Sequence, residues 1–375
     1  MTATITGVPF AQPSYAPGAR EAALRVIDSG WTTTGAECAA FEEEFAAYLG
    51  VDHVVVMSSC TQALELSLRA LRLPPGAAVL TPSLTFCGAV AAIVHAGLRP
   101  VLVDVDEDSL VPDERAVAAT VRRVGKVHAM VVCHLGGYPV DINRLAGAAG
   151  LSRHRIVEDA AHGPGGGING RDSQAACFSF YATKNLPIGE GGAVATCDPE
   201  LDAWLRSARL HGMTKDAWRR YLPGGSWRYD VASIGFKANL TDLQAAIGRA
   251  QLQAVDAWQQ RKTLLAARYD AELGHLLRLP SRSEGHAWHL YQVRVPGRDE
   301  LARELAAAGI GNSVHFIPVH QLTAFAALLG ADECQACPVT DRVADELLSL
   351  PLYPSLSDGQ QSAVIDAVVA GLRRS

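Results

Sequence analysis

The chain has 375 residues, of which 49% are hydrophobic and 19% charged, and this balance is typical of a globular protein and excludes a disordered one. A formal net charge of −6 gives no sign of binding to nucleic acid or to an anionic membrane. No apolar run approaches the length of a membrane span, and the N-terminus lacks the basic and apolar regions of a signal peptide. We therefore predict a cytoplasmic protein.

The predicted elements begin with two amphipathic helices and continue as strands that alternate with helices. The helices cover residues 18–30 and 36–48, and the polar turn 31–35 joins them. The strands that follow cover 53–57, 78–80, 101–103, 129–133, 155–158 and 175–181, and the helices between them cover 61–72, 86–96, 112–123 and 141–149. Short apolar strands alternating with helices predict an α/β fold with a mostly parallel, doubly wound sheet flanked by helices. Such a sheet binds ligands beyond the carboxyl ends of its strands.

The pattern changes after residue 196. Residues 211–239 are polar and aromatic, and their length suggests a lid or a subunit contact. We predict one long helix over 241–261, followed by strands near 288–295 and 312–316 and helices over 298–308, 340–348 and 358–373. The chain would therefore form a large domain, residues 1–250, which includes the N-terminal segment and the 211–239 loop, and a smaller C-terminal α+β domain, residues 251–375.

Lys184 stands where a buried strand runs out into a glycine-rich turn. An ammonium group at the tip of a core strand is partly desolvated, which lowers its pKa. A lysine made neutral in this way can attack a carbonyl and form a Schiff base. We therefore predict that Lys184 holds pyridoxal 5′-phosphate.

This cofactor needs partners that the sequence also provides. A carboxylate must keep the ring nitrogen protonated, and Asp159 lies at the end of a predicted strand; the alternative role for Asp159 is a helix N-cap. The phosphate needs N–H groups at a helix start together with hydroxyl groups, which are offered by Ser59, Cys60, Thr61 and Ser179. Ordinary helix capping also explains the first three.

Phe86 follows another strand end, and its ring would either stack on the cofactor or pack in the core. The glycine-rich run 163–167 lacks the GxGxxG spacing of a dinucleotide site and precedes no evident helix. Cys334 and Cys337 form a single CxxC pair without a second pair nearby, so we predict a surface loop there and no metal site.

Several ordered motifs then support a family resemblance. From residue 30 to residue 353 the chain resembles the DegT-type sugar aminotransferases, which are pyridoxal-phosphate enzymes of the aspartate-aminotransferase fold, fold type I. The motifs are Gly30-Trp31…Gly35, Ser58-Ser59-Cys60-Thr61, Pro82 to Phe86, Glu158 to His162, Ser179 to Asn185 with Gly189 to Gly192, Asn239 to Gly248, and Val314 to His320.

The resemblance implies a role for each matching residue. Lys184 would carry the Schiff base and move the proton between substrate and cofactor, and Asp159 would pair with the ring nitrogen. His162 would lie beside the ring and Phe86 would stack on it, while Ser59, Cys60, Thr61 and Ser179 would hold the phosphate. Cys60 stands where the family motif has glycine, so its side chain must point away from the phosphate. The family active site lies at a homodimer interface, where the partner contributes a phosphate contact, here Lys237 or Asn239.

The resemblance also implies ping-pong transfer of the amino group from L-glutamate, which becomes 2-oxoglutarate, to a nucleotide-linked 4-keto sugar. The segment 211–221 suits a diphosphate, although a solvated loop explains it equally well. The substrate-binding candidates are Trp31, Thr33, Lys215, Arg219, Arg220, His315 and His320, and the last two are also explained as structural histidines. An aminocyclitol aminotransferase, or a non-catalytic regulator that binds the cofactor, remains an alternative.

Overall fold

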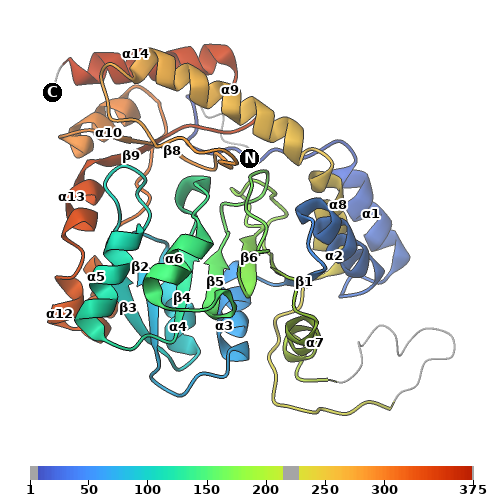
Figure 1. Cartoon of the computed structure of the whole chain (residues 1–375). Helices are drawn as coiled ribbons and strands as arrows, with labels where there is room; N and C mark the ends of the chain where they lie inside the picture. The colour runs from blue at the N-terminus through green and yellow to red at the C-terminus, as the bar shows by residue number, and fades with distance from the viewer. Residues whose placement is uncertain (1–6, 214–227, 374–375) are drawn as a thin grey trace.

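Seven strands form the central sheet of the computed structural model, which describes residues 7–213 and 228–373 (Figure 1). Their order is β1-β7-β6-β5-β4-β2-β3. All neighbouring pairs are parallel except those of β7, which runs antiparallel to both β1 and β6. The predicted mostly parallel sheet is therefore confirmed. The strands are β1 (His53–Met57), β2 (Ala78–Pro82), β3 (Arg99–Val103), β4 (Ala129–Cys133), β5 (Ile156–Asp159), β6 (Ala175–Ser179) and β7 (Gly192–Thr196).

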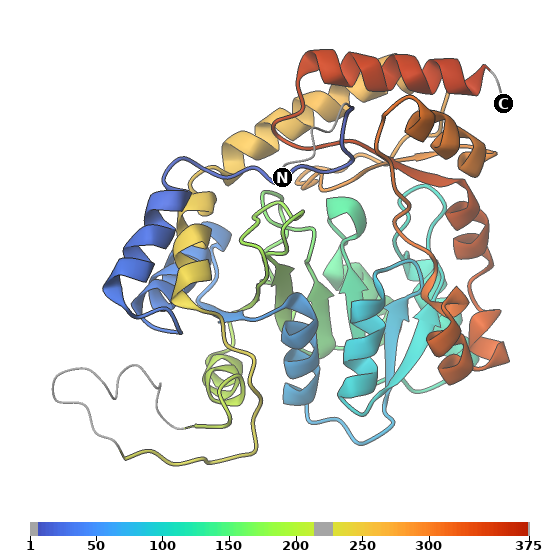
Figure 2. The ribbon, with the colours of Figure 1, turned by 180° about the vertical axis from the view of Figure 1, so that it is seen from behind.

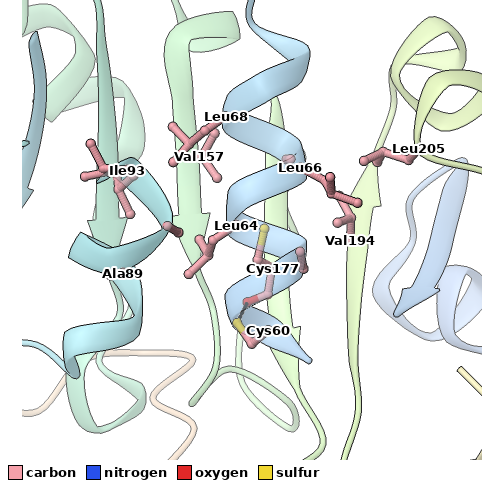
Figure 3. Packing of buried hydrophobic residues seen from close by; sticks show 14 of the residues in the cluster. Cys60, Leu64, Leu66, Leu68, Ala89, Ile93, Val157, Cys177, Val194 and Leu205 are labelled. Carbon is pink, nitrogen blue, oxygen red and sulfur yellow. Dashed lines mark hydrogen bonds between the residues drawn. The ribbon is translucent and has the colours of Figure 1, made fainter. Parts of the chain in front are cut away.

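Helices cover both faces of this sheet because the strand side chains alternate between two apolar cores. Val55 and Met57 of β1 face a core that includes α3 (Cys60–Ala70), α4 (Cys87–His95) and α7 (Pro199–Ala208), and Figure 3 shows Leu64, Leu66 and Leu68 of α3 lying against the strands. Val54 and Val56 face the opposite core. The helices on that side are α2 (Ala36–Leu49), α5 (Glu114–Val124), α6 (Ile142–Ala149) and α8 (Asp242–Leu252).

The remaining elements surround a smaller sheet, in which β8 (Tyr291–Arg294) pairs antiparallel with β9 (Leu347–Leu350). Figures 1 and 2 show α9 (Val255–Leu273) and α14 (Asp358–Leu372) lying over this sheet. Val8, from the N-terminal segment, belongs to the same apolar core. The other elements are α1 (Ala19–Ser29), α10 (Arg298–Ala307), α11 (Thr323–Leu329), α12 (Ala331–Cys334), α13 (Pro338–Glu346) and the short 3-10 helices η1 (Leu135–Gly137), η2 (Arg153–Arg155) and η4 (Val319–Gln321).

Two predicted elements of the C-terminal part were wrong. The helix predicted over 241–261 is two helices, because Gln251 at the end of α8 is tied to the N-terminal segment and to Pro187 O, while α9 turns toward the small sheet. The strand predicted near 312–316 is only an isolated bridge between Ser313 and Ser349. The true partner of β8 is β9, which the prediction had placed at the end of a helix.

The CxxC pair does not lie in a simple surface loop, as predicted, because Cys337 is fully buried at the start of α13. Among the helices within 7–213 and 228–373, none is long and apolar enough to cross a membrane. We propose that the two sheets mark the two domains expected from the sequence, with the boundary near the break between α8 and α9.

Glu42 of α2 fixes the position of β1 through a buried network. Its carboxylate accepts hydrogen bonds from Val56 N at 3.0 Å and from the guanidinium groups of Arg206 and Arg209. Arg209 also donates to Val56 O, and Arg209 is only 4% exposed. Removal of the carboxylate leaves a buried cation without its counter-charge.

We therefore expect Glu42→Ala to lower the free energy of unfolding by about 3–5 kcal/mol, measured by urea denaturation. Glu43→Ala, on the exposed neighbouring position, is the matched control and is expected to change it by less than about 0.5 kcal/mol. Equal losses in the two variants would show that the network contributes nothing specific.

Candidate active site

A cavity of about 340 Å³ opens at the carboxyl ends of the parallel strands. Because these ends meet at one edge of the sheet, residues far apart in the sequence are brought together there. Most of the predicted cofactor residues are among those that line it, which include Ser59, Cys60, Thr61, Phe86, Cys133, Asp159, His162, Ser179, Lys184, His289, His315 and Phe316.

Lys184 lies in the turn that follows β6, where its N–H donates to Tyr181 O at 2.9 Å. The side chain is partly exposed because it faces the cavity. Burial lowers the pKa of the Lys184 ammonium, and the carboxyl of Asp159 opposes this shift. The site therefore combines a lysine that loses its proton more readily than usual with an acidic group close to it.

Asp159 is the last residue of β5 and is 7% exposed. Its Oδ1 atom accepts a hydrogen bond from Ala161 N at 3.1 Å and lies 3.8 Å from Cys60 Sγ. Burial raises the pKa of this carboxyl, while the Ala161 N–H and Lys184 lower it. A cationic partner in the cavity would relieve the cost of the buried charge.

The amino end of α3 supplies the anion-binding part of the cavity. Ser59 caps the helix by accepting from Gln62 N at 3.2 Å, and Ser59, Cys60 and Thr61 line the cavity together with Ser179. The N–H groups of a first helical turn have no partner within the helix and can bind an anion. A Cβ atom at Gly192 would lie 2.5 Å from Cys60 N, so only glycine lets β7 approach the helix start this closely.

The side chain of Cys60 points toward the sheet (Figure 3). Its Sγ lies 3.3 Å from Cys177 O as well as near Asp159, and burial raises the pKa of its thiol, which stays protonated. Cys60, which stands where the family motif has glycine, therefore does not block the start of α3, and an anion can still bind there.

Aromatic rings border the cavity. Phe86 is 58% exposed and contacts the ring of Phe316 at a centroid distance of 5.9 Å. His162 stacks on His289 at 4.2 Å, and its Nδ1 accepts from Gly136 N at 3.1 Å. Burial lowers the pKa of His162 well below its usual range, so the ring is neutral and suits contact with a planar heterocycle.

A second group of predicted residues lies together outside this cavity. Asn239 donates to Thr34 Oγ1 at 2.6 Å and contacts the ammonium of Lys237, and Asp242 N donates to Thr33 O at 3.2 Å. Trp31 belongs to the same turn, since its Nε1 donates to Thr34 O. Within one chain, these residues do not line the cavity that holds Lys184.

The histidines predicted to face substrate divide between two places. His315 lines the cavity, its Nδ1 pairs with Ser349 Oγ at 2.9 Å, and burial lowers its pKa to about 4. His320 does not line it, because its two ring nitrogens are taken by Ser83 Oγ and Asp341 Oδ1. Lys215, Arg219 and Arg220 lie outside the described residues.

His289, Cys133 and Phe316 line the cavity but were not predicted as site residues. Cys133 could have been found, because it ends a predicted strand next to Asp159 in the sheet register. His289 carries no local signal, since it reaches the cavity from the segment before β8 and meets His162 only through the tertiary fold.

The donor set fits pyridoxal phosphate. An amine, a buried carboxylate and a helix start with two hydroxyl residues surround one cavity, and these are the groups required by its aldehyde, ring nitrogen and phosphate. The volume lies in the range of small-molecule sites.

Comparison with known proteins agrees with this fit. The model of the DegT/DnrJ/EryC1/StrS aminotransferase family matches residues 16–369. The spore coat polysaccharide biosynthesis protein SpsC of Bacillus subtilis (strain 168) is 39% identical, with 96% of each chain covered. The sugar aminotransferase Spr1654 of Streptococcus pneumoniae, described as putative and solved in a PMP form, superposes with a TM-score of 0.90 at 29% identity over 98% of this chain and 100% of that one. DesV of S. venezuelae superposes with a TM-score of 0.85 at 36% identity, with 95% of each chain covered.

Fold and site together define a pyridoxal-phosphate-dependent aminotransferase of fold type I. The chain belongs to the DegT/DnrJ/EryC1/StrS family, and it is a sugar aminotransferase.

Proposed function

We propose that this enzyme transfers the amino group of L-glutamate to a nucleotide-linked 4-keto sugar, with Lys184 as the Schiff-base lysine. The observation that carries the proposal is the position of Lys184, whose pKa is lowered by burial, in the same cavity as Asp159 and the start of α3.

Pyridoxal phosphate, when bound, supplies an aldehyde that condenses with amines and a ring that accepts an electron pair. Asp159 would keep a proton on the ring nitrogen, and its Oδ1 atom is already held by Ala161 N. The start of α3, with Ser59 and Thr61, would hold the phosphate together with Ser179. Phe86 and His162 would contact the ring.

Lys184 then has two tasks. Its Nζ would provide the amine that holds the cofactor and, once released by the amino donor, would move a proton between the substrate carbon and the cofactor. The second task requires a neutral amine, which the lowered pKa favours. Because Lys184 would serve the donor and then the acceptor in the same cavity, we expect ping-pong kinetics.

We also propose a homodimer with shared active sites. Trp31, Thr33, Lys237 and Asn239 form one cluster, and none of them lines the Lys184 cavity of their own chain. A two-fold axis would bring this cluster to the partner's cavity, where Lys237 or Asn239 would contact the phosphate.

The donor half-reaction tests the proposal without knowledge of the sugar. We expect L-glutamate alone to bleach the yellow colour of the purified holoenzyme and to yield one 2-oxoglutarate per site, whereas D-glutamate leaves the spectrum unchanged. A spectrum insensitive to L-glutamate would favour the regulator that binds cofactor without catalysis.

A panel of amino sugars and amino cyclitols, assayed with 2-oxoglutarate in the reverse direction, identifies the acceptor. Turnover of nucleotide-linked sugars supports the proposal, and turnover of free cyclitols alone would replace it with the aminocyclitol alternative. Arg219→Ala and Arg220→Ala distinguish the two kinds of acceptor, since loss of a cation weakens the binding of a diphosphate substrate and leaves the binding of a free cyclitol unaffected.

A further inference from the structure

A second, smaller cavity of about 60 Å³ lies behind Lys184. It shares Thr183, Lys184, His289 and His315 with the cofactor cavity, and its other walls include the N-terminal segment, α9 and the chain after β9. One water needs roughly 10–15 Å³ of such space, so the cavity holds a few waters or one small polar group.

Lys262 of α9 lines this cavity and is only 4% exposed. Its Nζ donates to Ala287 O at 3.1 Å, which uses one of three donors. No acidic side chain within residues 7–213 and 228–373 pairs with it. A buried ammonium without a counter-charge is costly, and burial accordingly lowers the pKa of Lys262 to about 7.

Two further residues with polar side chains line the same space. Tyr353 is 3% exposed, and its hydroxyl has no hydrogen-bond partner in the described part of the chain; the same holds for Ser14 Oγ. Buried hydroxyl groups are nearly always paired in folded proteins. Lys262, Tyr353 and Ser14 therefore leave an unmet set of donors around one cavity.

We propose that this cavity binds a carboxylate group of the amino donor, held by Lys262 Nζ and the hydroxyl of Tyr353. A carboxylate accepts several hydrogen bonds and carries the charge that the buried ammonium lacks, whereas a neutral sugar supplies no counter-charge. The cavity adjoins Lys184, the residue that the donor amine must displace, so a donor anchored there reaches the reacting centre. This inference rests on the proposed amino donor and specifies how the chain recognises it.

The test compares Lys262→Met and Tyr353→Phe with Lys126→Met, a change at an exposed lysine that lines neither cavity. The probe is glutarate, a dicarboxylate that has no amine and does not react, and its binding to the holoenzyme is measured by calorimetry. We expect its dissociation constant to rise ~10- to 100-fold in Lys262→Met and ~3- to 10-fold in Tyr353→Phe, with no change in Lys126→Met. In Lys262→Met and Tyr353→Phe, correspondingly higher concentrations of L-glutamate should be needed to reach the same rate of bleaching.

Thermal unfolding separates this role from a structural one. Because the Tyr353 hydroxyl has no partner to lose, Tyr353→Phe should leave the melting temperature of the enzyme unchanged or raise it. Wild-type affinity for glutarate in Lys262→Met, or no glutarate binding by the wild type, would overturn the inference. Failure of L-glutamate to bleach the wild-type enzyme would instead count against the proposed function.

Discussion

Replacing Lys184 with alanine is expected to lower the rate of amino transfer by a factor of about 10⁴ or more. Among the described residues Lys184 is the only lysine that lines the larger cavity, so no other amine there can take its place. The variant loses both the covalent attachment of the cofactor and the group that moves the proton. Single-turnover absorbance measurements with L-glutamate give the rate directly.

The control for this prediction is Lys126→Ala, which removes an exposed lysine and should retain wild-type turnover. Lys184→Ala should still bind pyridoxal phosphate through the start of α3 and Asp159, as equilibrium dialysis can measure. A rate within tenfold of the wild type would contradict the assignment of Lys184.

Asp159→Asn is expected to lower kcat by about 10²–10³-fold. Asparagine has nearly the same shape and keeps an oxygen that can accept from Ala161 N, but it carries no charge to hold a proton on the ring nitrogen. Asp159→Glu keeps the charge and is expected to recover part of the activity, which a purely structural role of the residue would not predict. Equal rates in Asp159→Asn and the wild type would refute the pairing.

The same substitution is expected to stabilise the apoenzyme. Burial raises the pKa of Asp159 in the folded chain, so the unfolded state releases this proton at a lower pH than the folded state does. Between the pKa of the unfolded state and that of the folded state, the folded chain therefore loses stability as pH rises. Asparagine does not ionise and escapes this loss. The melting temperature of apo Asp159→Asn should therefore exceed that of the apo wild type at pH 8, and the difference should shrink as pH falls toward about 4. Such a gain in stability with a loss of activity is typical of a residue kept for function.

The parts of the fold that could be predicted depend on local patterns. β1 and β4 agree with their predicted ranges, because a short run of apolar residues between turns is typical of a buried strand. The β8–β9 pair could not be predicted in this way. Residues 347–350 follow directly on a helical pattern, and it is their pairing with Tyr291–Arg294 that makes them a strand.

The same distinction applies to the active site. Lys184, Asp159 and Ser59 each follow or end a predicted strand, and the carboxyl ends of parallel strands lie at one edge, so sequence position alone predicted that they would meet. His320 shows the limit of this reasoning. Its motif matches the family, but both of its ring nitrogens form hydrogen bonds, one with Ser83 and one with Asp341. Neither residue is near His320 in the sequence.

For this protein, the sequence by itself determined the strands of the parallel sheet and the position of Lys184 and Asp159 at one edge of it, because strand periodicity and strand ends are local properties. Only the tertiary structure decided that His289 stacks on His162 and that Lys237 and Asn239 do not line the cavity of their own chain. It also decided that Lys262 is buried with no acidic partner among residues 7–213 and 228–373. These features depend on packing between segments more than 100 residues apart, or on the environment that such packing creates, and no local pattern encodes either.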